Sequence, residues 1–370
     1  MVSFDKGVRM IEDRRTVRVG LIGYGYAGKT FHAPLIRSVP GLELTIVGSS
    51  KRDTVLADIP GVAVSSNMEE VATHPEVDLL VIASPNESHY PLAAAALLAG
   101  KHVVVDKPFT VKLADARSLV QLAEEQGKLL SVFHNRRWDS EVLATKAIVQ
   151  SGVLGEISHF ETHIDRFRPQ VRQRWREQAG PGAGLWFDLG PHLIDQAVQL
   201  FGLPLTINAS FAVLRKGGET DDWAHVQLNY KSLRVILHAS LLVSGGVPRS
   251  VLHGTLGSWA KFGPDVQERQ LVAGMLPGST GFGDDPDPGI LYEGTTGKQT
   301  KIPAPAANQA DYYFGIREAL GGRQPNPVPP EQACAVMAIL ETSFKSGTEE
   351  QVLPLQLTEK EREAFADWQT

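Results

Sequence analysis

The feature that most constrains the fold of this chain is a repeated change of period that begins at residue 17. Short apolar runs, typical of strands covered on both faces, alternate there with segments of helical periodicity. The apolar runs are VRVGLIG (17–23), LELTIVG (42–48), VDLLVIAS (77–84), HVVVD (102–106) and LLSVFH (129–134). Helical segments are expected from about Gly28 and at 67–73, 88–99 and 113–126. Strands that alternate with helices form βαβ units, so the first third of the chain is predicted to be a doubly wound parallel sheet.

The first apolar run ends in GYGYAG, which gives Gly23, Gly25 and Gly28 the spacing G-x-G-x-x-G. In dinucleotide-binding folds these glycines allow a tight turn, a close approach of the backbone to a pyrophosphate, and packing of the helix on the strand. The pattern alone is weak, but here it follows a predicted strand and opens a predicted helix. We therefore predict that this loop, including Tyr24, binds a dinucleotide; the alternative is a glycine-rich turn without a ligand.

The end of the second predicted strand indicates which dinucleotide binds. NAD-preferring sites usually have Asp or Glu there, which accepts hydrogen bonds from the ribose hydroxyls. This chain has Ser49, Ser50, Lys51 and Arg52 instead. Two hydroxyls and two cations suit a 2′-phosphate, which favours NADP(H) over NAD(H). The alternative is a surface loop whose charges are unrelated to a ligand.

Composition argues against several classes of partner. The formal net charge is −6 and no run of Lys and Arg is interleaved with aromatic residues, so a nucleic-acid partner is not expected. The longest apolar run, 92–100, is about half the length needed to span a bilayer, so a membrane partner is not expected either. Residues 1–15 are charged where a signal peptide would be apolar, and Cys334 is the single cysteine. Both observations favour a cytoplasmic protein in a reducing compartment.

Several motifs in a fixed order then suggest a family. GYGYAG is followed by SPNESH (84–89), AGKHVVVDKPF (99–109) and FHNRRWD (133–139), and in this the chain resembles the glucose–fructose oxidoreductase, inositol dehydrogenase and MocA family. GPGAGLWFDLGPHLID (180–195) is similar to a second signature of that family. RFRPQVRQRWRE (166–177) resembles the branch that contains NADP-dependent scyllo-inositol dehydrogenases. The resemblance covers most of the chain.

The resemblance implies an α/β fold with two domains. We expect an N-terminal Rossmann domain at 16–137 and a C-terminal α+β domain at 138–350, with 1–15 and 351–370 as terminal extensions. The C-terminal domain of the family has a large, mostly antiparallel open sheet that contacts the substrate and often forms a dimer interface. A homo-oligomer, either a dimer or a tetramer, is therefore expected. The residue pattern agrees, because the later strand candidates follow one another without intervening helices.

Lys107 directly follows the predicted strand 102–106, although a charge at the end of a buried strand costs free energy unless it is paired or used. Ligands of parallel sheets bind beyond the carboxyl ends of the strands, which is where Lys107 is expected. The resemblance implies that Lys107 is the catalytic lysine of the family's E-K-P motif. Asp106 stands where the family commonly has Glu, and the shorter carboxylate can change how Lys107 is held.

Asp188, His192 and Asp195 recur in FDLGPHLID at spacings of four and three, which would put them on one side of a helix. Pro191 either starts that helix, with Gly190 as the N-cap, or kinks a longer one. From the spacing alone, His192 is as readily a buried histidine paired with Asp188 as a catalytic one. The resemblance favours catalysis, because D-x-x-x-H belongs to the family signature.

The segment GEISHFETHIDRF (155–167) predicts a strand with one polar face, formed by His159, Glu161, His163 and Asp165. This face has three interpretations: solvent exposure, a metal site of His/Glu type, or hydrogen bonding to a polyhydroxylated substrate. Side chains two apart on one strand lie too far apart for compact metal ligation without distortion. No metal site is therefore assigned, and His163 and Asp165 are weaker candidates for substrate binding.

Further cofactor-binding candidates come from the family motifs. Asn86 follows the third predicted strand and is expected to meet the ribose or nicotinamide end of the cofactor. The other candidates that fall in these motifs are Ser84, His89, Asp106, Lys107, Arg136, Trp175 and Arg176. Trp175 could instead be a packing residue, and the arginines a solvated cluster.

Together with these residues, the resemblance implies an enzyme that transfers a hydride between NADP(H) and a CH–OH group or ketone of a cyclic polyol or sugar, of the scyllo-inositol and scyllo-inosose type. The cofactor carries the hydride chemistry, so the protein has to manage the proton of the substrate oxygen. We expect Lys107 and His192 to contact the substrate, with His192 exchanging the proton, Lys107 polarising the oxygen and relaying the proton, and Asp188 orienting His192. The roles of lysine and histidine could be exchanged. The alternative functions are reduction of another sugar ketone and non-catalytic NADP sensing.

Overall fold

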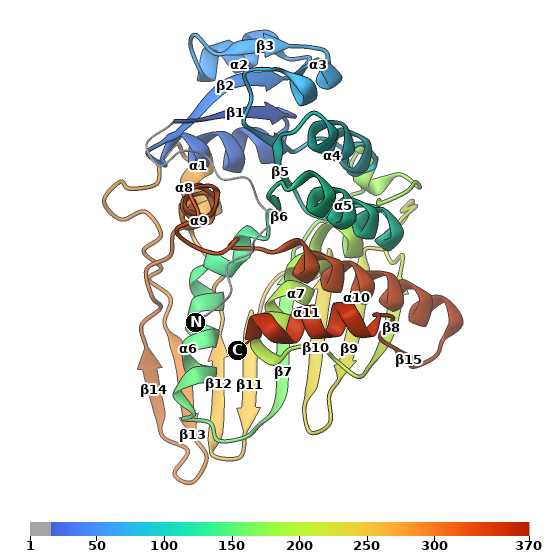
Figure 1. Cartoon of the computed structure of the whole chain (residues 1–370). Coiled ribbons are helices and arrows are strands. Elements are labelled where there is room, and N and C mark those ends of the chain that lie inside the picture. Colours follow the sequence, from blue (N-terminus) through green and yellow to red (C-terminus); the bar gives the residue numbers. More distant parts are fainter. Residues whose placement is uncertain (1–15, 370) are drawn as a thin grey trace. The chain divides into compact units, whose positions relative to one another are not determined.

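A computed structural model of the chain describes residues 16–369 (Figure 1). The chain forms two compact units, and each is assembled from separate segments. The first unit contains the described residues up to Asn135, Gln267–Phe282 and Asn308–Cys334. The second unit contains Arg136–Val266, Gly283–Ala307 and the described residues from Ala335 onward. The predicted domains, 16–137 and 138–350, were each one continuous segment, whereas each observed unit combines several segments. The predicted extension 1–15 lies outside the described residues.

The first unit is built on a six-stranded sheet in the order β3-β2-β1-β4-β5-β6, and all of its pairings are parallel (Figure 1). Its strands are β1 (Val17–Ile22), β2 (Leu42–Gly48), β3 (Ala63–Ser65), β4 (Leu79–Ile82), β5 (His102–Val105) and β6 (Leu130–Val132). Every residue of β4 and β5 is buried, as expected for strands covered on both faces. The order of strands reverses between β1 and β4, as in dinucleotide-binding Rossmann sheets. The predicted doubly wound parallel sheet is confirmed.

The edge strand β3 was not predicted from the sequence. It has three residues, none of them buried, and it pairs only with β2 in the described sheet. A strand this short and this exposed has no apolar run or clear alternation that would reveal it. The predicted run 77–84 is consequently the fourth strand of the chain, not the third.

Helices connect the strands of the first unit, and two more helices join it from later in the chain. The helices are η1 (Gly28–His32), α1 (Ala33–Arg37), α2 (Arg52–Asp58), α3 (Met68–Thr73), η2 (Asn86–Ser88), α4 (His89–Leu98), α5 (Leu113–Gln126), α8 (Gln267–Val272) and α9 (Ala310–Leu320). An aromatic cluster attaches α9: the ring of Phe133 lies 5.0 Å from that of Tyr312 and 5.6 Å from that of Tyr313, between ring centroids. The Tyr312 hydroxyl also donates to Ser131 Oγ at 2.9 Å. This packing explains why 308–334 belongs to the first unit, although its sequence position had suggested the C-terminal domain.

The second unit is built on a nine-stranded sheet in the order β14-β13-β12-β11-β7-β10-β9-β8-β15 (Figure 1). Among the described strands of this sheet, β7 and β10 pair in parallel and every other pair is antiparallel. The strands are β7 (Ile157–Asp165), β8 (Thr206–Ala212), β9 (Trp223–Asn229), β10 (Arg234–Ser240), β11 (Ser250–Gly254), β12 (Gly257–Lys261), β13 (Gly289–Glu293), β14 (Gln299–Ile302) and β15 (Leu353–Pro354). The accompanying helices are η3 (Asn135–Trp138), α6 (Ser140–Ser151), η4 (Trp175–Glu177), α7 (Leu185–Phe201), α10 (Pro330–Glu349) and α11 (Glu359–Gln369). The predicted large, mostly antiparallel sheet is confirmed.

Two helices cover one face of this sheet. Phe160 of β7 is fully buried, and its ring lies 5.4 Å from that of Phe201 on α7. On β8, Phe211 stacks on Phe344 of α10 with a centroid distance of 5.0 Å. Side chains alternate between the faces of a strand, so the neighbouring residues of β7 and β8 point away from α7 and α10.

The end of the chain is part of the second unit, although 351–370 was predicted to be a terminal extension. Leu353 of β15 pairs with Ile207 of β8 and so extends the sheet by a strand. Helix α11 begins with a capping box, in which Glu361 N–H donates to Thr358 Oγ1 at 3.2 Å and Thr358 N–H donates to Glu361 Oε2 at 2.7 Å. Phe365 of α11 is only 2% exposed, so this helix packs on the unit.

Candidate active site

The glycine loop after β1 leaves open space at one of its three glycines. Gly23 has a φ of +96°, and a Cβ built there would lie 2.4 Å from the carbonyl oxygen of Ala83. A Cβ on Gly28 would lie 2.0 Å from the carbonyl oxygen of Gly23. A Cβ on Gly25, in contrast, would have no atom within 4 Å. The first and third glycines are thus required by protein packing, and the middle one leaves room for a ligand to approach the backbone, as a pyrophosphate does in this fold.

The four residues after β2 form a polar, partly cationic end to the strand. Ser49 is buried and its Oγ accepts from the backbone N–H of Lys51 at 3.1 Å, while Ser50, Lys51 and Arg52 are exposed. The Arg52 guanidinium donates to the carbonyl oxygen of Val64 at 2.9 Å. Because β2 lies next to β1, this cationic end follows the strand beside the glycine loop. Its hydroxyls and cations are suitable donors for a phosphate.

Tyr24, in the glycine loop, is tied to helix α2. Its hydroxyl donates to Asp58 Oδ2 at 3.2 Å, and Lys29 Nζ lies 2.7 Å from the same oxygen. Burial and the neighbouring Asp58 carboxylate raise the pKa of Tyr24 to about 12. Tyr24 is therefore a neutral residue that holds the loop in place.

The loop after β4, which contains SPNESH, is connected to the loop after β5 by His89. Asn86 and His89 are buried, and the hydroxyls of Ser84 and Ser88 lie 2.6 Å apart. His89 Nε2 lies 3.0 Å from the carbonyl oxygen of Ser84, and its Nδ1 lies 2.9 Å from that of Pro108. Burial lowers the pKa of this imidazole. His89 thus links the two loops. Because it is only 1% exposed, it is suited to hold these loops in place.

Asp106 and Lys107 follow the carboxyl end of β5. Asp106 Oδ1 accepts from the backbone N–H of Lys107 at 2.7 Å, and Oδ2 lies 3.7 Å from His32 Nε2. Burial acts to raise the pKa of Asp106, but His32 and Lys107 outweigh it and hold that pKa below its usual range. His32 is itself held by the hydroxyl of Tyr313, 2.5 Å from Nδ1. An ionised carboxylate therefore adjoins Lys107, in agreement with the need for a counter-charge at the end of a buried strand.

Asp188 and His192 lie four residues apart on α7, which begins at Leu185 and contains Pro191. Of the two predicted arrangements, the longer helix with an internal proline is the one observed. Proline inside a helix removes one backbone hydrogen bond, and Gly190 before it is packed so closely that a Cβ there would lie 2.7 Å from the ring of Trp186. Asp188 and His192 therefore lie on the same side of α7.

Trp175 and Arg176 of η4 interact with the first turns of α7. The Arg176 guanidinium lies over the Trp175 ring, 4.5 Å from its centroid, and Arg176 Nε lies 3.5 Å from Asp188 Oδ1. The side chain of Arg176 is 31% exposed and that of Asp188 is 18% exposed. These predicted site residues are thus brought together with Asp188 within the second unit.

Arg136 and Asp195 are engaged in ion pairs of their own. Arg136 Nη1 donates to Asp139 Oδ2 at 2.9 Å. Asp195 accepts hydrogen bonds from Arg137, of which the shorter ones are 2.9 Å from Nε to Oδ2 and 2.6 Å from Nη2 to Oδ1. Asp195 therefore anchors the start of the second unit to α7. Of the three residues that the sequence pattern put on this helix, Asp195 is structural, and Asp188 and His192 stay as the candidate catalytic pair.

The N-terminus of α7 is capped by Asp221, a residue that was not singled out in the sequence. Its Oδ2 accepts from the backbone N–H of Trp186 at 2.7 Å, and its carbonyl oxygen accepts from Leu185 N–H at 3.0 Å. Burial raises the pKa of Asp221 to about 6, because it outweighs the stabilising backbone N–H groups. Asp221 is 35 positions from Trp186 in the sequence, so no local pattern could have revealed the cap.

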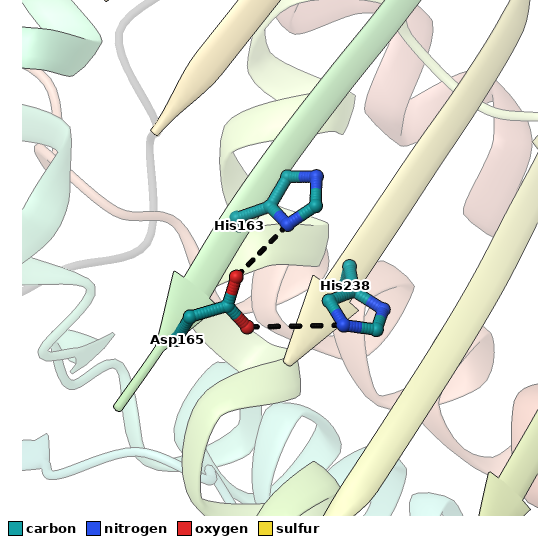
Figure 2. Close-up of side chains that lie close together, drawn as sticks. All are labelled: His163, Asp165 and His238. Atoms are coloured by element: carbon teal, nitrogen blue, oxygen red, sulfur yellow. Dashed lines mark hydrogen bonds and ion pairs between the residues drawn. The ribbon is translucent and has the colours of Figure 1, made fainter. Parts of the chain in front are cut away.

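The predicted polar face of β7 is observed, and it carries a cluster of histidines and carboxylates (Figure 2). His163 lies between two carboxylates, with Nδ1 at 3.0 Å from Asp165 Oδ2 and Nε2 at 2.8 Å from Glu161 Oε1. Burial acts to lower the pKa of His163, but these two carboxylates raise it to about 9, and the pKa of Glu161 falls to about 2 through its bond to His163. His238, on the parallel neighbour β10, points its Nε2 at Asp165 Oδ1 at 3.8 Å.

This face is the one opposite to α7, because the intervening residue Phe160 packs on that helix. The structure therefore does not bring His163 and Asp165, the weaker substrate-binding candidates, to the side of the sheet on which His192 lies. Lys107 and the glycine loop belong to the first unit, whereas His192 belongs to the second. His32, Asp221 and His238 are the residues of these sites that sequence reasoning missed.

No helix among residues 16–369 is long and apolar enough to cross a membrane.

Comparison with known proteins identifies relatives over nearly the whole chain. The family model of Gfo/Idh/MocA oxidoreductases with an NAD-binding Rossmann fold matches residues 17–134, and that of the Gfo/Idh/MocA C-terminal domain matches residues 142–260. The uncharacterised oxidoreductase YdgJ of Escherichia coli is 50% identical over 90% of this chain and 96% of its own length. IolW of Bacillus subtilis, named scyllo-inositol 2-dehydrogenase (NADP(+)), is 34% identical over 96% of this chain and 100% of its own length. A Klebsiella pneumoniae protein with a known crystal structure superimposes with a TM-score of 0.91, at 51% identity, over 96% of this chain and 100% of that chain.

The different surroundings of the glycines predict different consequences of the same substitution. Gly25→Ala adds a methyl group in open space, so we expect unchanged thermal stability but binding of NADPH weakened about tenfold or more, which is ~1.4 kcal/mol. Gly28→Ala puts a Cβ against a backbone oxygen and should lower the melting temperature. Fluorescence titration with NADPH and thermal unfolding measure the two effects. A Gly25→Ala protein that binds NADPH like the wild type would contradict the assignment of that space to a cofactor.

The cap on α7 predicts a pH dependence of stability. The folded pKa of Asp221 lies above its unfolded value of 3.8, so the protonated side chain is the form that the fold favours. Its contribution to stability should be complete below pH 3.8 and be lost as the pH rises through about 6. Asp221→Asn keeps the acceptor oxygen and does not titrate. The stability of the wild type relative to this variant should therefore fall between these pH values in urea titrations; a constant difference would refute the raised pKa.

Proposed function

Because the chain belongs to the Gfo/Idh/MocA oxidoreductase family, we propose that it is an NADP(H)-dependent enzyme that interconverts a CH–OH group and a ketone on a cyclic polyol or sugar. The substrate class that we propose is the scyllo-inositol and scyllo-inosose type. Support for this class comes from the name of IolW, which aligns over its full length at 34% identity. The observation that carries the proposal is the hydrogen bond from the backbone of Lys107 to an ionised Asp106 at the carboxyl end of β5. The same sheet contains β1, which leads into the glycine loop with its open space at Gly25.

The residues present fit a dinucleotide with a 2′-phosphate. The backbone at Gly25 would approach the pyrophosphate, and Ser50, Lys51 and Arg52 would hold the 2′-phosphate through hydroxyl and cationic donors. Asn86, in the loop after β4, would meet the ribose or nicotinamide end. When bound, the nicotinamide supplies the hydride acceptor or donor.

In this proposal the chain's own residues manage the proton of the substrate oxygen. Lys107 polarises that oxygen with its ammonium group, and the Asp106 carboxylate fixes the backbone of Lys107, from which the side chain extends. His192 takes the proton when the alcohol is oxidised and returns it when the ketone is reduced. The exchanged assignment, with Lys107 as the direct proton donor and acceptor, uses the same two groups.

Asp188 is assigned to the orientation of His192. The two residues lie one helical turn apart on α7, where a carboxylate can fix the ring of an imidazole. Arg176 Nε lies 3.5 Å from Asp188 and supplies it with a counter-charge, and stacking on Trp175 restricts the Arg176 side chain. Trp175 and Arg176 are thus proposed to act on the catalytic pair through Asp188.

Removal of either proton-handling group should slow turnover strongly and leave cofactor binding nearly unchanged. We expect Lys107→Met and His192→Ala each to lower kcat by about a hundredfold or more, because a positioned acid–base group contributes roughly 10²–10⁴-fold. The dissociation constant for NADPH should change by less than about threefold. Lys112→Met is the matched control, since Lys112 is an exposed lysine five residues from Lys107 in the sequence. Full activity of either catalytic variant would defeat the mechanism.

The cofactor preference is expected to depend on the cationic end of β2. Lys51→Ala combined with Arg52→Ala should weaken NADPH binding about 10- to 100-fold, as expected for loss of hydrogen bonds from charged donors, and leave NADH binding nearly unchanged. Lys112→Met again serves as the control. Titration of each protein with both cofactors measures the preference. NADH binding as tight as that of NADPH in the wild type would refute the proposal for NADP(H).

The substrate class is tested by a screen of cyclic polyols and sugar ketones, in which the absorbance of NADPH is followed in both directions. Turnover of inositols or their ketones supports the proposal. Turnover confined to open-chain or anhydro-sugar ketones identifies a different reductase. Binding of NADPH without turnover of any compound in the screen identifies a non-catalytic sensor.

A further inference from the structure

We propose that His163, Asp165 and His238, on the sheet face opposite to α7, form a binding site for a divalent transition-metal ion such as Zn²⁺ (Figure 2). The site lies in the second unit and is independent of the proposed hydride transfer.

The register of the sheet is what assembles the three side chains. β7 and β10 pair in parallel, with His163 directly opposite His238. Asp165 is two residues along β7 from His163 and so lies on the same face. The two imidazole rings are 5.0 Å apart between centroids, and one donor atom from each of the three residues lies within 4.8 Å of the others. The site thus draws its ligands from two strands, which avoids the distortion that ligation by one strand alone would require.

The donor atoms of the three side chains lie almost as close together as the ligand atoms of a bound metal ion. The Asp165 carboxylate faces both rings, with Oδ2 at 3.0 Å from His163 Nδ1 and Oδ1 at 3.8 Å from His238 Nε2 (Figure 2). In a tetrahedral site with bonds of about 2.0–2.1 Å, the donor atoms are roughly 3.3 Å apart. The two observed separations fall on either side of that value. Small side-chain rotations would therefore be sufficient to admit an ion.

Burial also argues against simple solvent exposure. The side chains of His163, Asp165 and His238 are only 14%, 12% and 12% exposed. Asp165 Oδ1 is buried and has no hydrogen-bond partner among the described residues. An unsatisfied buried oxygen costs about 1–3 kcal/mol, and more when it is charged. A cation bound between this oxygen and the two imidazoles would remove that cost.

The donor set and its surroundings suit zinc more than magnesium or calcium. Two imidazole nitrogens and one carboxylate oxygen are typical zinc ligands, whereas Mg²⁺ and Ca²⁺ prefer oxygen donors throughout. Glu161 accepts from His163 Nε2 at 2.8 Å, the arrangement in which a carboxylate orients a metal-bound histidine. On metal binding the ion takes the position of the His163 Nδ1 proton, which leaves to solvent. The fourth position is available to water or to His225, whose ring lies 5.6 Å from that of His238.

Metal binding at this position would join β7 to β10 at the parallel pair of the sheet. A ligand that binds the folded state and not the unfolded state stabilises the fold by mass action. The ion is therefore expected to act as a structural clamp, and the second unit should melt at a higher temperature in its presence.

The test uses the full-length, untagged protein after removal of metal with EDTA. Isothermal titration with ZnCl₂ and elemental analysis should give about one Zn²⁺ per chain, with a raised melting temperature and no competition from excess Mg²⁺. Asp165→Asn and His238→Gln should each weaken Zn²⁺ binding about tenfold or more and abolish the thermal shift. Glu161→Gln should weaken it roughly 10- to 100-fold, as loss of an orienting carboxylate does.

His253→Ala is the matched control, because His253 lies on the same face of the sheet, opposite His159, and outside the cluster. It should bind Zn²⁺ like the wild type. The melting curve of each variant without metal establishes whether that variant folds. Because Asp165→Asn and His238→Gln each remove one ligand, the proposal can still be tested if one of the two variants fails to fold. Absence of stoichiometric binding by the wild type would overturn the proposal. Equal binding by the control and both ligand variants would also overturn it, since the ion would then be bound adventitiously elsewhere.

Discussion

A lysine that follows a fully buried strand needs an opposite charge beside it, and the organisation of the first unit around Lys107 meets that need. Asp106 is 8% exposed, remains ionised because His32 and Lys107 favour its charged form, and accepts from the backbone of Lys107 itself. His32 is in turn held by Tyr313 of α9, a helix that lies far along the chain. The end of β5, the helix η1 that carries His32, and the late helix α9 therefore meet around the buried carboxylate of Asp106.

In the second unit, the candidate catalytic residues and the cluster of histidines and carboxylates lie on opposite faces of one sheet. The apolar positions of β7 pack on α7, whose own first turns are capped by Asp221 and carry Asp188 and His192. The polar positions of β7 meet those of β10 on the other face. Because strand side chains alternate strictly, the same nine residues of β7 support a helix with candidate catalytic groups on one side and a cluster of metal-ligand type on the other.

Features that depend on neighbouring residues could be predicted from the sequence, and features that depend on register could not. The apolar runs predicted five of the six parallel strands, and the position of Lys107 just beyond the carboxyl end of a buried strand was predicted from the same pattern. The partner of Asp165 on β10 could not be predicted, because only the parallel register brings His238 to His163. The same holds for Asp221 on α7 and for the aromatic contacts that join α9 to the first unit. The odd positions of β7 were correctly recognised as a polar face, but a single strand could not reveal that its neighbour supplies a second histidine.

The proposed catalytic role of Lys107 has one direct physical requirement: its amine has to reach the oxygen that is oxidised or reduced. A crystal structure of the protein with NADP⁺ and a bound inositol would measure this distance. We predict Lys107 Nζ within about 2.6–3.2 Å of a carbinol oxygen whose carbon faces the nicotinamide. An inositol bound on the histidine face of β7, or an Nζ that is remote from every substrate oxygen, would contradict it.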